Sequence, residues 1–110
     1  MHTVINHIPV VAEHQEAFEA QFRASLVHME GVPGFVRVDV WRPVPGRGPA
    51  DEANPPAYMI QTVWKSAEAF RAWVGSDSFR ASHREPMPDT WRAGAARMTV
   101  HELAFGETGS

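Results

Sequence analysis

The fold is decided by residues 58–74, whose sequence is YMIQTVWKSAEAFRAWV. Residues 58–64 are rich in β-branched and aromatic side chains and predict a strand. Ser66 follows as an expected helix N-cap, and Glu68 lies in the first turn, where the positive end of the helix dipole favours a carboxylate. The helix that begins here should carry four apolar side chains on one face, namely Ala69, Phe70, Trp73 and Val74. The stretch therefore predicts a strand that leads directly into an amphipathic helix.

Upstream of this stretch, the sequence predicts a strand, a long helix, a second strand and a loop. Residues 3–10 alternate as a strand does and place four side chains on one face, namely Val4, Asn6, Ile8 and Val10. Residues 12–29 carry apolar side chains at helical spacing, namely Phe18, Phe22, Leu26 and Met29. Residues 35–42 predict a strand with Val36, Val38 and Val40 on one face. Residues 43–57 contain five prolines and predict an exposed loop.

Downstream, the sequence predicts a second, shorter helix and a last strand. Ser76 or Asp77 can cap this helix, in which Phe79 and His83 lie four positions apart on the same side. Residues 96–105 alternate as a final strand. His83 thus lies on a stripe that otherwise faces the core.

The predicted order β-α-β-β-α-β is that of the ferredoxin-like split βαβ arrangement, an α+β fold. It places two helices on one face of a four-stranded antiparallel sheet. We expect a single domain over residues 1–106 and a polar tail over residues 107–110. The other face of the sheet would expose apolar side chains such as Ile5, and a second copy is their simplest cover. The expected assembly is therefore a homodimer.

Composition narrows the possible partners and chemistry. A chain of 110 residues has room for one modest core. The formal net charge is -3 and the basic residues are scattered, which argues against nucleic acid and membranes as partners. No apolar run is long enough to span a membrane and no secretory pattern is present, so we expect a cytoplasmic location. The absence of cysteine excludes thiolate metal sites, so a metal must be held by histidine or carboxylate, or arrive inside a cofactor.

Three residues are candidates for chemistry, namely Asn6, Trp73 and His83. A neutral imidazole can bind heme iron, and Phe79 on the same helix offers apolar surface for a porphyrin. Asn6 is unusual in a strand, and an unpaired amide on the covered face costs about 1 to 3 kcal/mol. Ordinary structure offers an alternative for each residue. His83 could cap a helix, Trp73 could pack in the core, and Asn6 could bond to a neighbouring loop.

With these residues the chain resembles the IsdG-like heme-degrading monooxygenases, within the antibiotic biosynthesis monooxygenase superfamily of dimeric ferredoxin-like domains. The resemblance runs almost end to end. Residues 62–83 are similar to the staphylococcal enzymes through TVWKS at 62–66, Ala69-Phe70, Trp73, Ser76-Asp77, Phe79 and Ala81-Ser82-His83. Residues 22–44 are similar to the mycobacterial branch through Phe22, Pro33-Gly34-Phe35 and Arg42-Pro43-Val44.

The resemblance implies a catalytic set of Asn6, Trp73 and His83. In this set His83 is the axial ligand of heme iron, Asn6 forms hydrogen bonds on the distal side, and Trp73 presses on the porphyrin so that it ruffles. Phe22 would line the heme pocket, although ordinary packing between helix and sheet also explains it. Heme would be both substrate and oxygen-activating cofactor, with no other metal, and two copies would pair through the bare sheet face into a β-barrel.

The resulting hypothesis is a heme oxygenase that opens the porphyrin with O2 and electrons from an external reductase, releasing iron and an open tetrapyrrole. Two rivals remain. One is a cofactor-independent monooxygenase acting on a quinol or polyketide-like aromatic, and the other is a protein that binds heme without degrading it. The chain departs from the family at His7, where the staphylococcal enzymes carry arginine, and in residues 43–57, a longer loop than the mycobacterial one.

Overall fold

The computed structural model describes residues 1–44, 46, 55–84 and 86–109, so most of the predicted loop at 43–57 lies outside the described residues. The strands are β1 (His2–Ile8), β2 (Phe35–Trp41), β3 (Tyr58–Trp64) and β4 (Arg97–Glu102). The helices are α1 (Gln15–Ser25), α2 (Ala67–Val74) and α3 (Asp77–Ser82). Short 3-10 segments are η1 (Ala12–His14), η2 (Leu26–Met29) and η3 (Asp89–Trp91). Among the described residues, no helix is long and apolar enough to cross a membrane.

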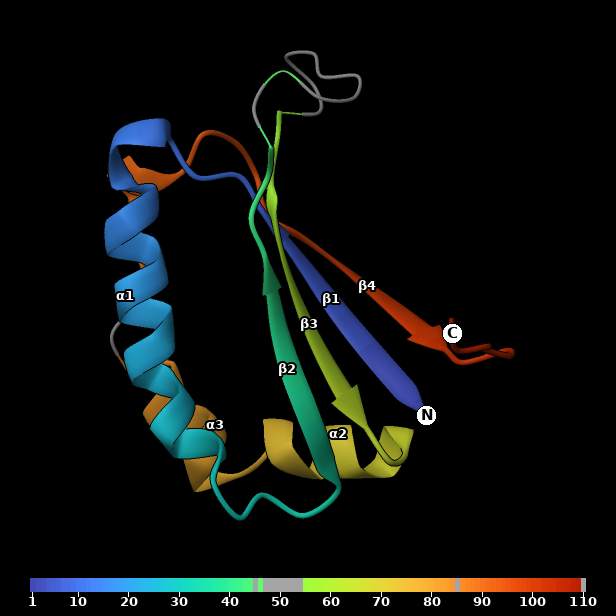
Figure 1. The fold of residues 1–110 in the computed structure, drawn as a ribbon. Coiled ribbons are helices and arrows are strands. Elements are labelled where there is room, and N and C mark those ends of the chain that lie inside the picture. Colours follow the sequence, from blue (N-terminus) through green and yellow to red (C-terminus); the bar gives the residue numbers. More distant parts are fainter. Residues whose placement is uncertain (45, 47–54, 85, 110) are drawn as a thin grey trace.

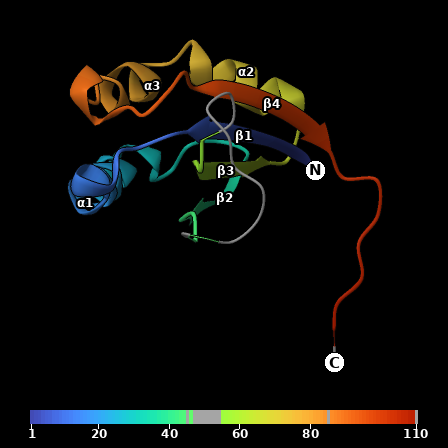
Figure 2. The ribbon, with the colours of Figure 1, turned by 90° about the horizontal axis from the view of Figure 1, so that it is seen from above.

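The strands form one antiparallel sheet in the order β2-β3-β1-β4. The central strand β1 pairs with β3 and β4, and Asn6 lies opposite Ile60 on one side and Met98 on the other. In Figure 1, α1 runs along the sheet while α2 and α3 lie towards its lower end. Figure 2 shows α1 and α3 on the same side of the sheet. The predicted ferredoxin-like α+β fold is confirmed.

Two buried clusters lie between the helices and the sheet. One contains Val4, Met29 and the fully buried Trp64, and Phe70 and Trp73 pack against it. The other lies towards the opposite ends of β1 and β3 and contains Val10, Phe18, Tyr58 and Ile60. Burial of such aromatic and aliphatic side chains is the main source of stability in a domain of this size.

A polar clamp joins α1 to the sheet. The Arg42 guanidinium binds both carboxylate oxygens of Glu19, with Nε 2.6 Å from Oε2 and Nη2 2.7 Å from Oε1. The Tyr58 hydroxyl donates a hydrogen bond to the same carboxylate. The Arg42 and Tyr58 bonds lower the pKa of Glu19 to about 2, because they stabilise its charged form. Burial, together with the bond to Glu19, raises the pKa of Tyr58 to about 12. The clamp fixes the position of α1 over the sheet.

Several predicted boundaries were wrong. The helix expected over residues 12–29 is divided into η1, α1 and η2, since its ends adopt the tighter 3-10 turn. The first strand ends at Ile8, because Pro9 has no N–H to donate to a ladder, and Val10 forms only an isolated bridge with Arg92. The final strand ends at Glu102 rather than residue 105.

The strand β2 also differs from its predicted pattern. Its register with β3 shifts between Phe35 and Arg37, so Val36 has no paired position. A bulge adds one residue to one strand and breaks the alternation of faces. Val36, which was predicted to share a face with Val38 and Val40, therefore does not lie in register with them.

The face of the sheet away from the helices is more polar than expected. His7 and His101 both form hydrogen bonds with the Thr99 hydroxyl, at 3.1 and 2.9 Å. Trp41 donates to Gln61, while Ile5 lies between these polar groups and is half-buried. Burial lowers the pKa of His7, as do Arg97 and His101 beside it. The departure from the family at His7 therefore lies on this face, away from the helices.

Candidate functional site

A cavity of about 620 Å³ lies between the helices and the sheet. Its floor is the helix-facing side of the sheet, and its walls come from α1, α2, α3 and the segment before β4. A volume of this size is within the range of small-molecule and cofactor sites. The side chains that the sequence singled out all line it, namely Asn6, Phe22, Trp73 and His83.

The imidazole of His83 is oriented by the end of α3. His83 is the C-cap of this helix, and its Nδ1 lies 2.9 Å from the carbonyl oxygen of Phe79. A carbonyl can only accept, so this contact favours the tautomer in which Nδ1 carries the proton and Nε2 keeps its lone pair. The ring also stacks on Phe79, with centroids 4.1 Å apart. These contacts favour the tautomer, and give the rigid support, that an imidazole ligand requires.

Trp73 stands between the buried cluster and the cavity, held by aromatic contacts. Its ring lies 5.3 Å from Trp64 and 4.9 Å from Phe79, the latter edge-to-face. His83 is the next ring along, at 6.2 Å. The Trp73 indole N–H is buried and has no hydrogen-bond partner among the described residues. The carbonyl partner that ordinary core packing would provide for this group is therefore absent from the described part of the chain.

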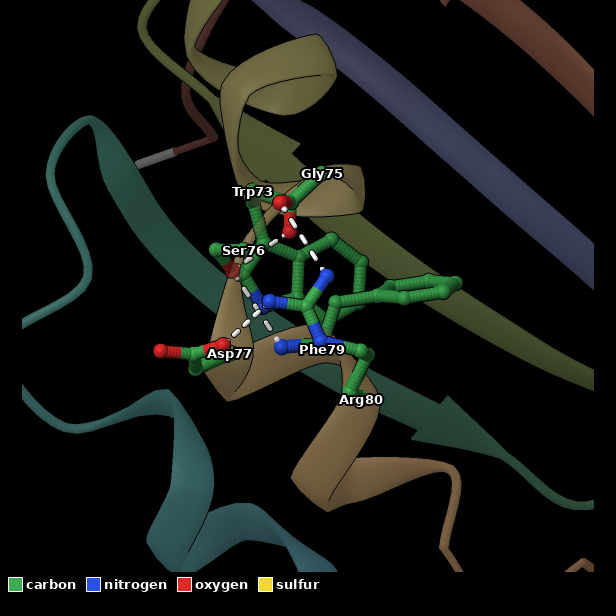
Figure 3. Close-up of polar contacts among 6 residues, drawn as sticks. All are labelled: Trp73, Gly75, Ser76, Asp77, Phe79 and Arg80. Carbon is green, nitrogen blue, oxygen red and sulfur yellow. Dashed lines mark hydrogen bonds and ion pairs between the residues drawn. The ribbon is translucent and has the colours of Figure 1, made fainter.

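The turn between α2 and α3 fixes Trp73 relative to Phe79 (Figure 3). Ser76 is the N-cap of α3, since its hydroxyl accepts from the Phe79 N–H at 3.2 Å, and it also donates to the Trp73 carbonyl. Arg80 pairs with Asp77 and donates to the Gly75 carbonyl, so its charge is engaged at this turn. The predicted cap at Ser66 is confirmed, and of the two residues predicted to cap α3, Ser76 does so.

Asn6 lies at the middle of β1 and faces the cavity between Val4 and Ile8. Its amide has no hydrogen bond to any described residue, so the neighbouring loop that could have satisfied it does not do so within the described chain. The amide is half-buried, and its remaining exposure is towards the cavity. It offers one acceptor and two donors to a bound molecule.

The structure also shows lining residues that the sequence did not single out. Gln21 and Ser25 contribute from α1, Met87 from the segment after α3, and Arg92 from the residue after η3. The spacing of Gln21 and Ser25 relative to Phe18 and Phe22 was a usable signal for α1. Arg92 and Met87 gave no signal, because they follow an irregular segment whose path no periodicity predicts.

A second cavity of about 690 Å³ lies on the other side of Trp73. It is formed by the chain around Gly34, by the α2 residues Ala69 and Ala72, and by Ser76. Neither Asn6 nor His83 borders it. The first cavity is therefore the candidate site, since it alone combines an available imidazole with an amide that has no described partner.

The chain also matches a known protein family. The profile of the family described as antibiotic biosynthesis monooxygenase matches residues 1–85. The chain belongs to the antibiotic biosynthesis monooxygenase family. Within this family, its similarity to curated heme oxygenases confirms the resemblance to the IsdG-like branch, and the comparison supports an oxygenase enzyme.

Two curated relatives from this family are similar over most of their length. A heme oxygenase of Staphylococcus saprophyticus, described as staphylobilin-producing, is 30% identical over 83 residues, which cover 76% of this chain and 73% of the relative. A mycobilin-producing heme oxygenase of Mycobacterium tuberculosis is 33% identical over 82 residues, covering 73% and 70%. These descriptions apply to the relatives.

Solved structures of the family share the fold. A mutant of MhuD with two manganese protoporphyrin IX molecules per active site has a TM-score of 0.77 and 27% identity, covering 99% of this chain and all of that one. The heme-degrader MhuD from Mycobacterium tuberculosis with two hemes bound has a TM-score of 0.75 and 25% identity, covering 98% and 100%. SnoaB, a cofactor-independent oxygenase from Streptomyces nogalater, matches with a TM-score of 0.65, 19% identity and coverage of 96% and 94%, which shows the shared fold alone.

Proposed function

We propose that this chain is a heme-degrading monooxygenase, with heme as substrate and as oxygen-activating cofactor. The supporting observation is the cavity that brings Asn6, Trp73 and His83 together on apolar walls. The donor set fits heme, because one imidazole nitrogen is available and two polar groups, the Asn6 amide and the Trp73 N–H, have no partner among the described residues. The curated heme oxygenases among the relatives support the same assignment.

His83 would hold the heme iron through Nε2. The bond from Nδ1 to the Phe79 carbonyl keeps the ring from rotating and increases the electron density on the ligating nitrogen. When bound, heme supplies the iron that activates O2 and the ring that is opened, with electrons from an external donor. The protein therefore has to orient the macrocycle, exclude bulk water and place donors beside the reacting edge.

Asn6 and Trp73 would contribute in different ways, Asn6 by hydrogen bonding and Trp73 by packing. The Asn6 amide can donate a hydrogen bond to a polar group above the ring, because nothing in the described chain competes for it. The Trp73 side chain is held in place, since the rings of Trp64 and Phe79 contact it. Its rigid indole would constrain the shape of a bound porphyrin by packing, and heme would supply the oxygen chemistry. Phe22 would provide part of the apolar wall.

Heme titration followed by the Soret band tests the proposal. The wild type should bind heme and degrade it with ascorbate and O2, whereas His83→Ala should lose the spectrum of the axial ligand and the turnover. His28→Ala is the matched control, because His28 is exposed and lies outside this cavity. Absence of any Soret shift in the wild type, or unchanged binding and turnover in His83→Ala, would refute the proposal.

A second pair of variants separates the chemistry from the packing. Trp73→Ala should retain heme, because the ligand and most of the apolar wall remain, but lose most of its turnover. Trp73→Phe should recover part of it, since a ring still occupies the position. Undiminished degradation by Trp73→Ala would show that Trp73 only packs. Stable heme binding without turnover in the wild type would instead select a heme-binding protein, and O2 uptake with a quinol in heme-free protein would select a cofactor-independent monooxygenase.

We also propose that two copies pair through the sheet face that carries Ile5 and His7. Half-buried Ile5 and the exposed ring of Trp41 lie on this face, and no described element covers them. Its hydrogen-bonded groups, such as His7 with Thr99, would enter the interface already partnered, which reduces the cost of their burial. The expected product is a β-barrel made from two sheets.

A further inference from the structure

One described residue brings a permanent charge to the cavity. Among its described lining residues, Arg92 is the single side chain with a permanent charge. Its backbone is fixed, because it forms a bridge with Val10 and its N–H donates to the Asp89 carbonyl at 3.1 Å. The side chain is exposed. Arg92 thus places a cation at the rim of a mostly apolar pocket whose other described polar residues carry no permanent charge.

This cation is not used elsewhere in the described structure. The other arginines with a described ion pair bind a carboxylate of the fold, in the pairs Arg37–Asp39, Arg42–Glu19, Arg71–Glu68 and Arg80–Asp77. No described carboxylate pairs with Arg92, and its guanidinium makes no hydrogen bond to a described residue. As far as the described residues go, its five donors are available to a ligand.

Arg92 also makes the two ends of the cavity chemically different. At the Val4 end of β1, the lining is closed by the cluster that includes Trp73 and Phe70. Arg92 lies at the other end of β1, directly after Trp91. Both Trp91 and Ile8 pack against the buried cluster that contains Val10 and Tyr58. Residues Val4 and Ile8 are about 13 Å apart along a strand. The cavity therefore has an aromatic end and, roughly one ring width away, a cationic end.

We propose that Arg92 binds a carboxylate of the tetrapyrrole and so sets the direction in which the ring enters. This inference rests on the proposed heme site. A planar guanidinium pairs with a carboxylate through two parallel hydrogen bonds, which fixes orientation as well as adding affinity. The apolar edge of the ring then points to Trp73 and the acidic edge to Arg92. Arg80, by contrast, already binds Asp77.

The test compares ferric protoporphyrin IX with its dimethyl ester, which has no ionisable carboxylate. Soret titrations in one buffer give the dissociation constant of each ligand for the wild type, Arg92→Gln and the control Arg84→Gln. Arg84 is exposed, lies beside His83 in sequence and does not line the cavity, so its substitution changes the net charge equally. The wild type should prefer the acid, and Arg92→Gln should lose about tenfold in affinity for the acid and nothing for the ester.

Arg84→Gln should stay within about twofold of the wild type for both ligands. The preference for the acid in the wild type should also decrease with added salt, since the pair lies at an exposed rim. An unchanged preference in Arg92→Gln, or an equal loss in Arg84→Gln, would overturn the assignment of Arg92 while leaving the heme site intact. If neither porphyrin shifts the Soret band of the wild type, the proposed function fails and this inference fails with it.

Discussion

Gly34 should be far more sensitive to substitution than Gly31, although both have the same kind of backbone. Gly34 has φ of +77° and Gly31 has φ of +73°, so alanine at either position is strained by about 1 kcal/mol. Their surroundings differ. A Cβ on Gly34 would overlap the Cβ of Ala69 in α2, whereas a Cβ on Gly31 would meet nothing within 4 Å.

The expected magnitudes follow from this difference. Overpacking of a close contact adds about 1 to 3 kcal/mol, so Gly34→Ala should destabilise the fold by about 2 to 4 kcal/mol and Gly31→Ala by about 1. Gly34 also accepts a hydrogen bond at 2.8 Å from the Lys65 N–H, which joins the start of β2 to the chain that leads into α2. Displacement here would move α2, the helix that carries Trp73.

Urea unfolding followed by tryptophan fluorescence measures both values, with equal slopes required before they are compared. Adding Ala69→Gly to Gly34→Ala should remove the overlap. The double variant should therefore regain the stability lost to the overlap, minus about 1 kcal/mol for glycine in a helix. Equal destabilisation by Gly34→Ala and Gly31→Ala would refute the reasoning, because it would show that the close approach of this loop to α2 does not constrain the fold.

Two further predictions concern the clamp and the open sheet face. Arg42 and Tyr58 lower the pKa of Glu19 from 4.5 to about 2, so the clamp stabilises the fold above pH 4.5 and this contribution is lost as the pH falls towards 2. Glu19→Gln should therefore lower the Tm above pH 4.5 and flatten its acid dependence, and a profile parallel to that of the wild type would contradict the clamp. Ile5→Glu should convert the proposed dimer to monomer in light scattering, whereas Val27→Glu, on an exposed position of η2, should not. A wild type that is already monomeric would exclude the pairing.

The order of the elements was predictable because each carried its own local signal. The alternation in β1, the cap at Ser66 and the spacing of Phe79 and His83 in α3 each depend on residues close in sequence. The α+β order then allowed few topologies, since handedness and short connections restrict them. The common location of Asn6 and Trp73 also followed, because both were assigned to the face between the sheet and its helices.

The features that escaped prediction depend on contacts between distant residues. The bulge at Val36 is a matter of register between β2 and β3, and nothing in the sequence of β2 alone indicates the extra residue. Arg92 is brought to the cavity by the pairing of its segment with residues 9–11, which are far away in sequence. Likewise, the clamp could not be predicted, because Glu19, Arg42 and Tyr58 are far apart in sequence and meet only in the fold.

The main-chain anchoring of His83 has a consequence for divergence within the family. Three groups lie within hydrogen-bond distance of one carbonyl oxygen, that of Phe79, namely the backbone N–H of His83, its Nδ1 and the hydroxyl of Ser82. Every amino acid has this carbonyl, so a substitution at position 79 leaves the acceptor in place as long as the last turn of α3 persists. The hydrogen bond that orients the imidazole therefore depends on the helix end, whereas the identity of residue 79 affects only the stacking contact.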